Sequence, residues 1–265
     1  MSEQAVLLRE LKGEVLWLTL NRPEQLNAMN PPLISELRDT FQSLRRDHSV
    51  RIVVLGAAGK AFCAGLDLND ASWSGKPSPN DLLEFQRSIS DIYRAMRQCP
   101  QPIISLVQGA ACGGGFSLAL ASDIRIAADT ARMNAAYIKA GLSACDMACS
   151  YLLPRLVGLS VASELMLTGR FIDAERALSV NLVSEVVNES ELAAAAEPWI
   201  ADLLSTSPMG LRLTKDGLNV AVDSASLEAA MALEDRQQAL VAMTEDAREA
   251  IEAFMEKRTP RWRDR

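Results

Sequence analysis

The chain has 265 residues, 49% of them hydrophobic and 23% charged, enough for one large globular domain or a domain with an appendage. A net charge of -7 argues against nucleic acid as a main partner, because phosphate backbones bind basic surfaces. The sequence has neither a signal peptide nor a run near the roughly 20 apolar residues of a membrane span, so we expect a cytoplasmic protein without membrane contact.

The first part of the chain alternates strand and helix patterns. Alternating or β-branched apolar residues predict strands at 14–20 and 51–55. Apolar residues at helical spacing predict amphipathic helices at 32–46 and 82–96. Residues 71–80 are rich in Ser, Pro, Gly and Asn and are expected to form a mobile loop. Such alternation indicates an α/β domain.

Three consecutive glycines, residues 113–115, follow an apolar run at 103–107 that predicts a buried strand. The Leu- and Ala-rich residues after the glycines favour a helix. Unpaired N–H groups and the helix dipole favour negative charge at a helix start, so this turn could be an anion hole made of main chain. A tight turn between packed elements explains this stretch alone equally well.

A second glycine-bearing turn at 64–67 follows the strand at 51–55. One main-chain N–H from each turn could together bind an oxygen on which charge develops, and one such donor is worth roughly 3–4 kcal/mol in the transition state. Residues 109–115 lack the spacing of a dinucleotide fingerprint. The five cysteines are expected to be reduced thiols. His48 is the single histidine, so plausible zinc ligands are too few and no metal site is expected.

The second part of the chain changes in character. Strands are predicted at 124–127 and 182–187, and from Ser190 onward every pattern is helical. We therefore predict an α/β core over residues 1–200, followed by a C-terminal helical region over residues 201–265.

Several motifs extend the glycine turns into a wider pattern. They are Asn-Arg-Pro-Glu-Gln-Leu-Asn-Ala at 21–28, Lys-Ala-Phe-Cys-Ala-Gly-Leu-Asp-Leu at 60–68, and the segments 109–118, 121–127, 153–158 and 165–170. Together they resemble the enoyl-CoA hydratase/isomerase (crotonase) family over roughly residues 5 to 258. The resemblance implies a spiral of repeated ββα turns with a C-terminal α-helical trimerisation region, assembled as a homotrimer or a dimer of trimers.

The resemblance also implies a substrate, an acyl-CoA thioester, and no cofactor apart from the coenzyme A that the substrate carries. By position, the N–H groups of Leu66 and Gly114 would hold the thioester oxygen while an enolate forms. The implied substrate- and CoA-binding residues are Arg22, Leu26, Ala28, Ala64, Asp67, Phe254 and Lys257. A buried aromatic for Phe254, and solvated charges for Arg22 and Lys257, are the alternatives.

The chain departs from the family where hydratases carry two glutamates, because Ser117 and Tyr137 occupy those positions. Serine is a poor base, and a phenol with a pKa of about 10 rarely accepts a proton at neutral pH. Asp146 aligns with the aspartate of dienoyl-CoA isomerases and stands alone in an almost uncharged segment, which would raise its pKa. Asp146 could instead, or also, cap a helix over 147–153.

These residues predict an acyl-CoA enzyme in which Asp146 moves protons on the enolate, by double-bond isomerisation or by hydration. Ser117 and Tyr137 would shape the pocket and position a water. Isomerisation needs only one acid/base group, so the residues favour it over standard hydration. The alternatives are a non-catalytic acyl-CoA binder, and an enzyme that hydrolyses or cleaves a C–C bond in a CoA ester.

Overall fold

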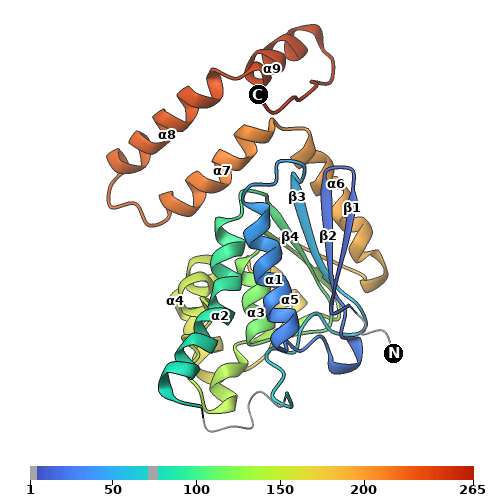
Figure 1. The fold of residues 1–265 in the computed structure, drawn as a ribbon, viewed down its shortest axis with the longest axis vertical. Helices are drawn as coiled ribbons and strands as arrows, with labels where there is room; N and C mark the ends of the chain where they lie inside the picture. The colour runs from blue at the N-terminus through green and yellow to red at the C-terminus, as the bar shows by residue number, and fades with distance from the viewer. Residues whose placement is uncertain (1–4, 71–76) are drawn as a thin grey trace.

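A computed structural model describes residues 5–70 and 77–265, which form one large sheet and one small sheet. Strands β1 to β4 of the large sheet are labelled in Figure 1. The large sheet has the strand order β1 (Leu7–Lys12), β2 (Val15–Leu20), β3 (Ile52–Ala57), β4 (Ile103–Val107), β6 (Ile124–Ala128) and β9 (Glu185–Val187). Only β1 and β2 pair antiparallel in this sheet. The small sheet contains β5 (Ala110–Cys112), β7 (Arg132–Asn134) and β8 (Ile172–Asp173).

Helices cover both faces of the large sheet, which explains why its central strands are apolar throughout. The helices α1 (Pro31–Leu44), α2 (Pro79–Gln98) and α3 (Gly114–Ala121) lie on one face, and α6 (Leu192–Leu204) lies on the other (Figure 1). Along β3, Val53 and Leu55 belong to the core under α1 and α2, whereas Ile52 and Val54 pack toward α6. The period of two along the strand therefore divides one apolar run between two cores.

The remaining elements complete the core and the connections between the sheets. They are η1 (Pro23–Gln25), η3 (Ala136–Ala140), α4 (Cys149–Thr168), α5 (Ala174–Ser179) and η4 (Glu189–Glu191). The expected α/β class and the predicted strands and helices are confirmed, with boundaries that differ by a few residues. Of the loop expected at 71–80, residues 71–76 lie outside the described part, and Ser78 caps α2 through a capping box with Asp81.

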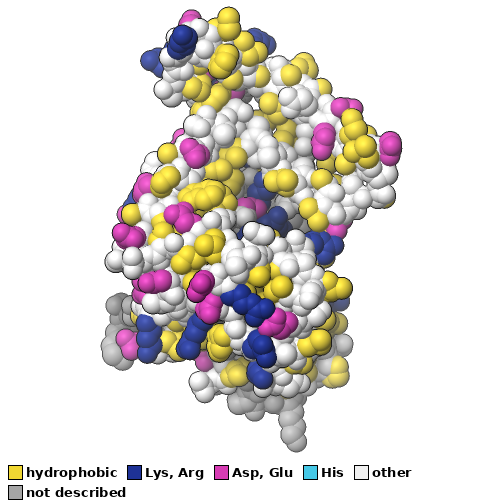
Figure 2. All heavy atoms as spheres, turned by 180° about the vertical axis from the view of Figure 1, so that it is seen from behind, with side chains coloured by type: hydrophobic (Ala, Val, Ile, Leu, Met, Phe, Trp, Pro, Cys, Tyr) yellow, Lys and Arg dark blue, Asp and Glu magenta, His cyan; other side chains and the backbone are white. Residues whose placement is uncertain are grey.

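Three helices, α7 (Pro208–Ala221), α8 (Leu227–Ala242) and α9 (Glu245–Glu256), project from the sheet as an arm (Figure 1). The predicted boundary at residue 200 falls inside α6, because Ile200 still packs in the core on the large sheet. The arm therefore begins after α6, near Ser207. Figure 2 shows hydrophobic side chains on the surface of α8 and α9. The large exposed apolar residues on these two helices and in the connection between them are Leu227, Met231, Leu240, Met243, Ile251, Phe254 and Met255.

None of the helices within the described ranges combines the length and the apolar character that a membrane span would need.

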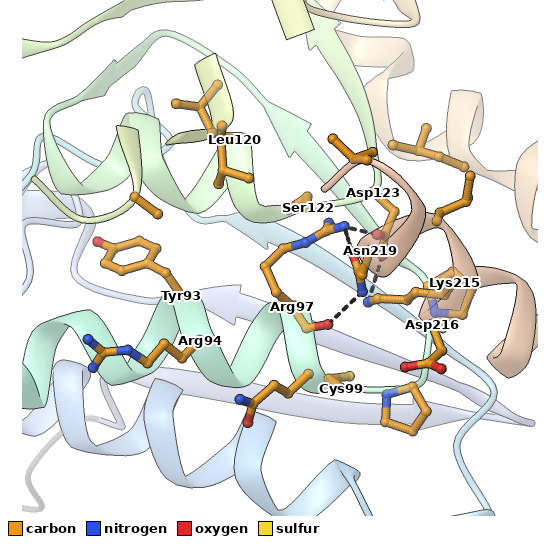
Figure 3. A pocket seen from close by; sticks show the side chains of 18 of the residues that line it. Tyr93, Arg94, Arg97, Cys99, Leu120, Ser122, Asp123, Lys215, Asp216 and Asn219 are labelled. Atoms are coloured by element: carbon orange, nitrogen blue, oxygen red, sulfur yellow. Dashed lines mark hydrogen bonds and ion pairs between the residues drawn. The ribbon is translucent and has the colours of Figure 1, made fainter. Parts of the chain in front are cut away.

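A polar cluster joins α7 to the core (Figure 3). The Lys215 ammonium lies 2.8 Å from a carboxylate oxygen of Asp123 and donates to the Gln101 carbonyl at 2.7 Å. The Arg97 guanidinium binds the other Asp123 oxygen at 2.8 Å, and Asn219 of α7 donates to the Arg97 carbonyl at 2.9 Å. The side chains of Arg97, Asp123, Lys215 and Asn219 line a cavity of about 970 Å³ between α2, α4 and α7.

We expect Asp123→Asn to lower the free energy of unfolding by about 3 kcal/mol, because Lys215, whose side chain is only 6% exposed, would lose its counter-charge. Urea denaturation checks this result, with the exposed Asp129→Asn as the control, expected within about 0.5 kcal/mol of the wild type. Equal stability of the two variants would contradict the assignment of Asp123 as the anchor of α7.

Candidate active site

The two glycine turns lie side by side, joined by a parallel bridge between Cys63 and Ala111. The Cys63 N–H donates to the Ala110 carbonyl at 3.0 Å, and the Cys112 N–H donates to the Cys63 carbonyl at 2.9 Å. The turn at 64–67 is thus fixed against β5, which leads directly into residues 113–115. The proximity that the sequence predicted for the two turns is therefore present.

Glycine is required where the two turns approach each other. A Cβ on Gly65, whose φ is +96°, would lie 2.9 Å from the Cys112 carbonyl oxygen and 3.7 Å from the Gly114 nitrogen. A Cβ on Gly115 would lie 2.1 Å from the Cys63 carbonyl oxygen. Because glycine has no side chain, the backbone around Leu66 can come close to the start of α3 at these two positions.

The main-chain N–H groups of Leu66 and Gly114 are unpaired within residues 5–70 and 77–265. One neighbour of each is paired, since the Asp67 N–H donates to the Met29 carbonyl at 3.0 Å and the Gly113 N–H donates to the Asn134 carbonyl at 3.0 Å. Gly114 is also the first residue of α3, where the helix dipole is positive. Two free donors on adjacent turns suit an oxygen that gains negative charge.

Ser117 and Tyr137 form a closed pair beside this turn. The Ser117 hydroxyl and the Tyr137 phenol lie 2.7 Å apart, and both side chains are buried. Burial raises the pKa of Tyr137 well above its usual value, so the phenol stays protonated. A Cβ on Gly113 would lie 3.5 Å from the Tyr137 ring, which places the ring against the glycine turn. The pair is neutral and cannot replace two carboxylates.

Asp146 lies in the turn before α4 and is half-buried. The alternative that it caps a helix over 147–153 is wrong, because α4 begins at Cys149 and its N-cap, Ala148, makes no side-chain bond. Met147 and Ala148 have φ values of 47° and 64°, a strained conformation for residues with side chains. Burial raises the pKa of Asp146, opposed by hydrogen bonds from the Met147 N–H and the Gln86 amide.

Tyr93 connects the Asp146 turn to the glycine turn. Its hydroxyl lies 3.0 Å from the Gly114 carbonyl oxygen and 3.3 Å from the Met147 sulfur, so its single proton can be donated to either acceptor. A Cβ on Gly114 would lie 3.1 Å from that sulfur, so the residue after Asp146 touches the start of α3. Sequence reasoning missed Tyr93 and Gln86, which looked like ordinary positions of an amphipathic helix.

Most of the other predicted binding residues gather at the turn at 64–67. Arg22 forms an ion pair with Asp67 at 2.9 Å and a hydrogen bond to the Ala28 carbonyl. Ala64 N–H donates to the Leu26 carbonyl at 3.0 Å. A solvated charge is therefore the wrong description of Arg22, whose side chain is only 14% exposed. Its guanidinium holds the turn in place.

Phe254 and Lys257 are not brought to this site within one chain. Phe254 lies on α9 and is 81% exposed, so the alternative of a buried aromatic is wrong. Lys257 follows α9 as an exposed residue with a φ of 54°. The arm carries both residues away from α3 (Figure 1). Within the described ranges, no group of three or more His, Cys, Asp or Glu side chains could hold a metal ion.

Comparison with known proteins identifies the family. The family model described as enoyl-CoA hydratase/isomerase matches residues 10–265. A probable enoyl-CoA hydratase of Mycobacterium bovis is 39% identical over 98% of this chain and 93% of its own length. The 1,2-epoxyphenylacetyl-CoA isomerase of Escherichia coli is 35% identical over 97% of each protein.

The fold agrees with this result. The crystal structure of an enoyl-CoA hydratase from Bacillus anthracis superposes with a TM-score of 0.92 at 30% identity, covering 98% of this chain and 100% of the other. The crotonase-like architecture implied by the sequence motifs is thereby confirmed, and the relatives are named as enzymes of both reaction types. The chain belongs to the enoyl-CoA hydratase/isomerase family.

Proposed function

We propose that this protein is an acyl-CoA isomerase in which Asp146 transfers a proton between two carbons of a thioester enolate. The observation that carries the proposal is the contact of the Asp146 turn with Gly114 through Met147 and Tyr93. Through this contact the Asp146 turn lies against the first residue of α3, whose N–H is one of the two unpaired donors, and burial raises the pKa of the Asp146 carboxyl. The neutral pair of Ser117 and Tyr137 stands where a hydratase would need carboxylates.

In this mechanism the thioester oxygen accepts hydrogen bonds from the N–H groups of Leu66 and Gly114. The Asp146 carboxylate removes a proton from the substrate carbon, and the electron pair moves onto the thioester oxygen. The protonated Asp146 then returns the proton to a different carbon, so the double bond shifts and no atom is gained or lost. The step needs no metal or cofactor, and coenzyme A enters only as part of the substrate.

Hydration is the second candidate for this site. Ser117 and Tyr137 can orient a water molecule through their hydroxyl groups, and Asp146 would then have to act on that water as well as on carbon.

Turnover of 2-enoyl-, 3-enoyl-, dienoyl- and β-keto-CoA thioesters separates the candidates. Isomerisation predicts conversion of 3-enoyl or dienoyl substrates faster than addition of water. CoA binding without any turnover would support an acyl-CoA binder, and release of free acid or a shortened acyl chain would support hydrolysis or C–C cleavage.

We propose that the arm assembles the protein as a homotrimer or a dimer of trimers. Exposed apolar side chains such as Ile251 and Met255 need a partner surface, and one copy leaves them in solvent. Phe254 and Lys257 would then reach the CoA of a neighbouring copy.

The free cysteines suit a reducing compartment such as the cytoplasm.

The pH dependence of kcat/KM should show an acidic limb set by Asp146. The carboxylate is the base, so activity falls as pH decreases through its pKa, which burial raises above the ordinary aspartate value of 3.8. A kcat/KM profile recorded with a 3-enoyl-CoA checks this result. A profile that stays flat down to the ordinary aspartate value would contradict the role of Asp146.

A further inference from the structure

Gln86 is separated from Asp146 by 60 positions in the sequence, yet its side-chain amide donates a hydrogen bond to Asp146 Oδ1. Gln86 lies on α2, whereas Asp146 lies before α4. The Met147 N–H donates to the same oxygen at 2.7 Å. Nothing in residues 5–70 and 77–265 donates to the other oxygen, Oδ2. The two oxygens of the carboxyl group therefore have unequal surroundings.

We infer that Gln86 is a positioning residue, which fixes Asp146 Oδ1 and leaves Oδ2 as the oxygen that exchanges the proton with substrate. This inference rests on the proposed function, because it assigns a task to one atom of the same carboxyl group. A glutamine amide suits the task, since it donates a hydrogen bond without carrying a charge that would titrate. The strained turn supplies the second donor from a separate element.

Among residues 5–70 and 77–265, the titratable side chains that face Asp146 are Tyr93 of α2, Tyr137 of η3 and Cys149 of α4. Burial raises the pKa of both phenols well above the usual value and that of the Cys149 thiol to about 12. All three are therefore neutral near pH 7. Burial raises the pKa of Asp146 because it favours the protonated carboxyl, and the hydrogen bonds from Gln86 and Met147 oppose this rise.

The test compares Gln86→Met with Gln98→Met, a matched change on the same helix at an exposed position. Both are made in full-length protein labelled with ¹³C at aspartate side-chain carboxyls. The Asp146 signal is identified by its loss in Asp146→Asn. Gln86→Met should move the titration midpoint of that signal upward, because the charged carboxylate loses a donor. Gln98→Met should leave it unchanged.

Activity provides the second readout. With a 3-enoyl-CoA, Gln86→Met should lower kcat about tenfold, leave KM within about twofold, and move the acidic limb upward with the carboxyl midpoint. Gln86→Glu serves if the methionine variant fails to fold, and it should also raise the midpoint, because two carboxyl groups would share one site. A midpoint unchanged by loss of the donor would overturn the inference.

The carboxyl titration does not depend on turnover, so the two hypotheses can fail separately. A raised midpoint in Gln86→Met together with full activity of Asp146→Asn would refute the proposed function and keep the contact. An inactive Asp146→Asn together with an unchanged midpoint would keep the proposed function and refute the role of Gln86.

Discussion

Asp146→Asn should lower kcat by about 10²- to 10⁴-fold on any substrate that the wild type isomerises, because the amide cannot accept the proton from carbon. Asparagine keeps the size of the side chain and its oxygen can still accept from Met147, so the fold and the strained turn should persist. Steady-state kinetics with a 3-enoyl-CoA measure the effect. The KM should change much less than kcat, since the proton is transferred only in the chemical step.

Asp129→Asn is the control for loss of one negative charge, because Asp129 is exposed at the end of β6. It should retain wild-type kcat. If Asp146→Asn and Asp129→Asn turn over the substrate equally well, Asp146 is not the acid/base group and the isomerase proposal loses its central residue.

Removal of the Leu66 N–H should cost about 10²- to 10³-fold in kcat, the usual effect of deleting one donor to an oxyanion. The change is an amide-to-ester substitution, made by incorporating the α-hydroxy analogue of leucine at position 66. It keeps the side chain, removes the donor, and makes the Gly65 carbonyl, which accepts from the Met29 N–H at 2.7 Å, a weaker acceptor. Because the Leu66 N–H is unpaired within the described ranges, the folded state should lose no internal hydrogen bond there.

The same substitution at Leu68 is the matched control. Leu68 lies two residues further on and its side chain is 68% exposed. The ester at 68 should leave kcat within about twofold of the wild type. Equal kcat values for the esters at positions 66 and 68 would show that Leu66 contributes no donor to the transition state.

The predictions that succeeded rest on local rules. The apolar run at 103–107 becomes the fully buried strand β4, since both faces of the sheet are covered. The two glycine turns were predictable as a pair because Gly65 and Gly115 stand where backbone approaches backbone, and no other residue fits there. The family motifs added the order of the elements along the spiral.

What sequence could not supply depends on packing between distant segments. Gln86 and Tyr93 meet the Asp146 turn only in the folded chain, where α2 packs against α3, and periodicity along α2 cannot indicate that partner. The N-cap interpretation of Asp146 failed because two residues with positive φ move the start of α4 to Cys149. Residue 200 was placed at the boundary by composition, yet Ile200 still contributes to the core.

The most direct test of the account is a crystal structure of this protein with a saturated acyl-CoA bound. We predict the thioester oxygen about 2.7–3.1 Å from both the Leu66 and the Gly114 nitrogen. We also predict Asp146 Oδ2 about 3–3.5 Å from the α- or γ-carbon, with Oδ1 still held by Gln86. A thioester oxygen bound elsewhere, or an Asp146 carboxyl group directed away from both carbons, would contradict the mechanism.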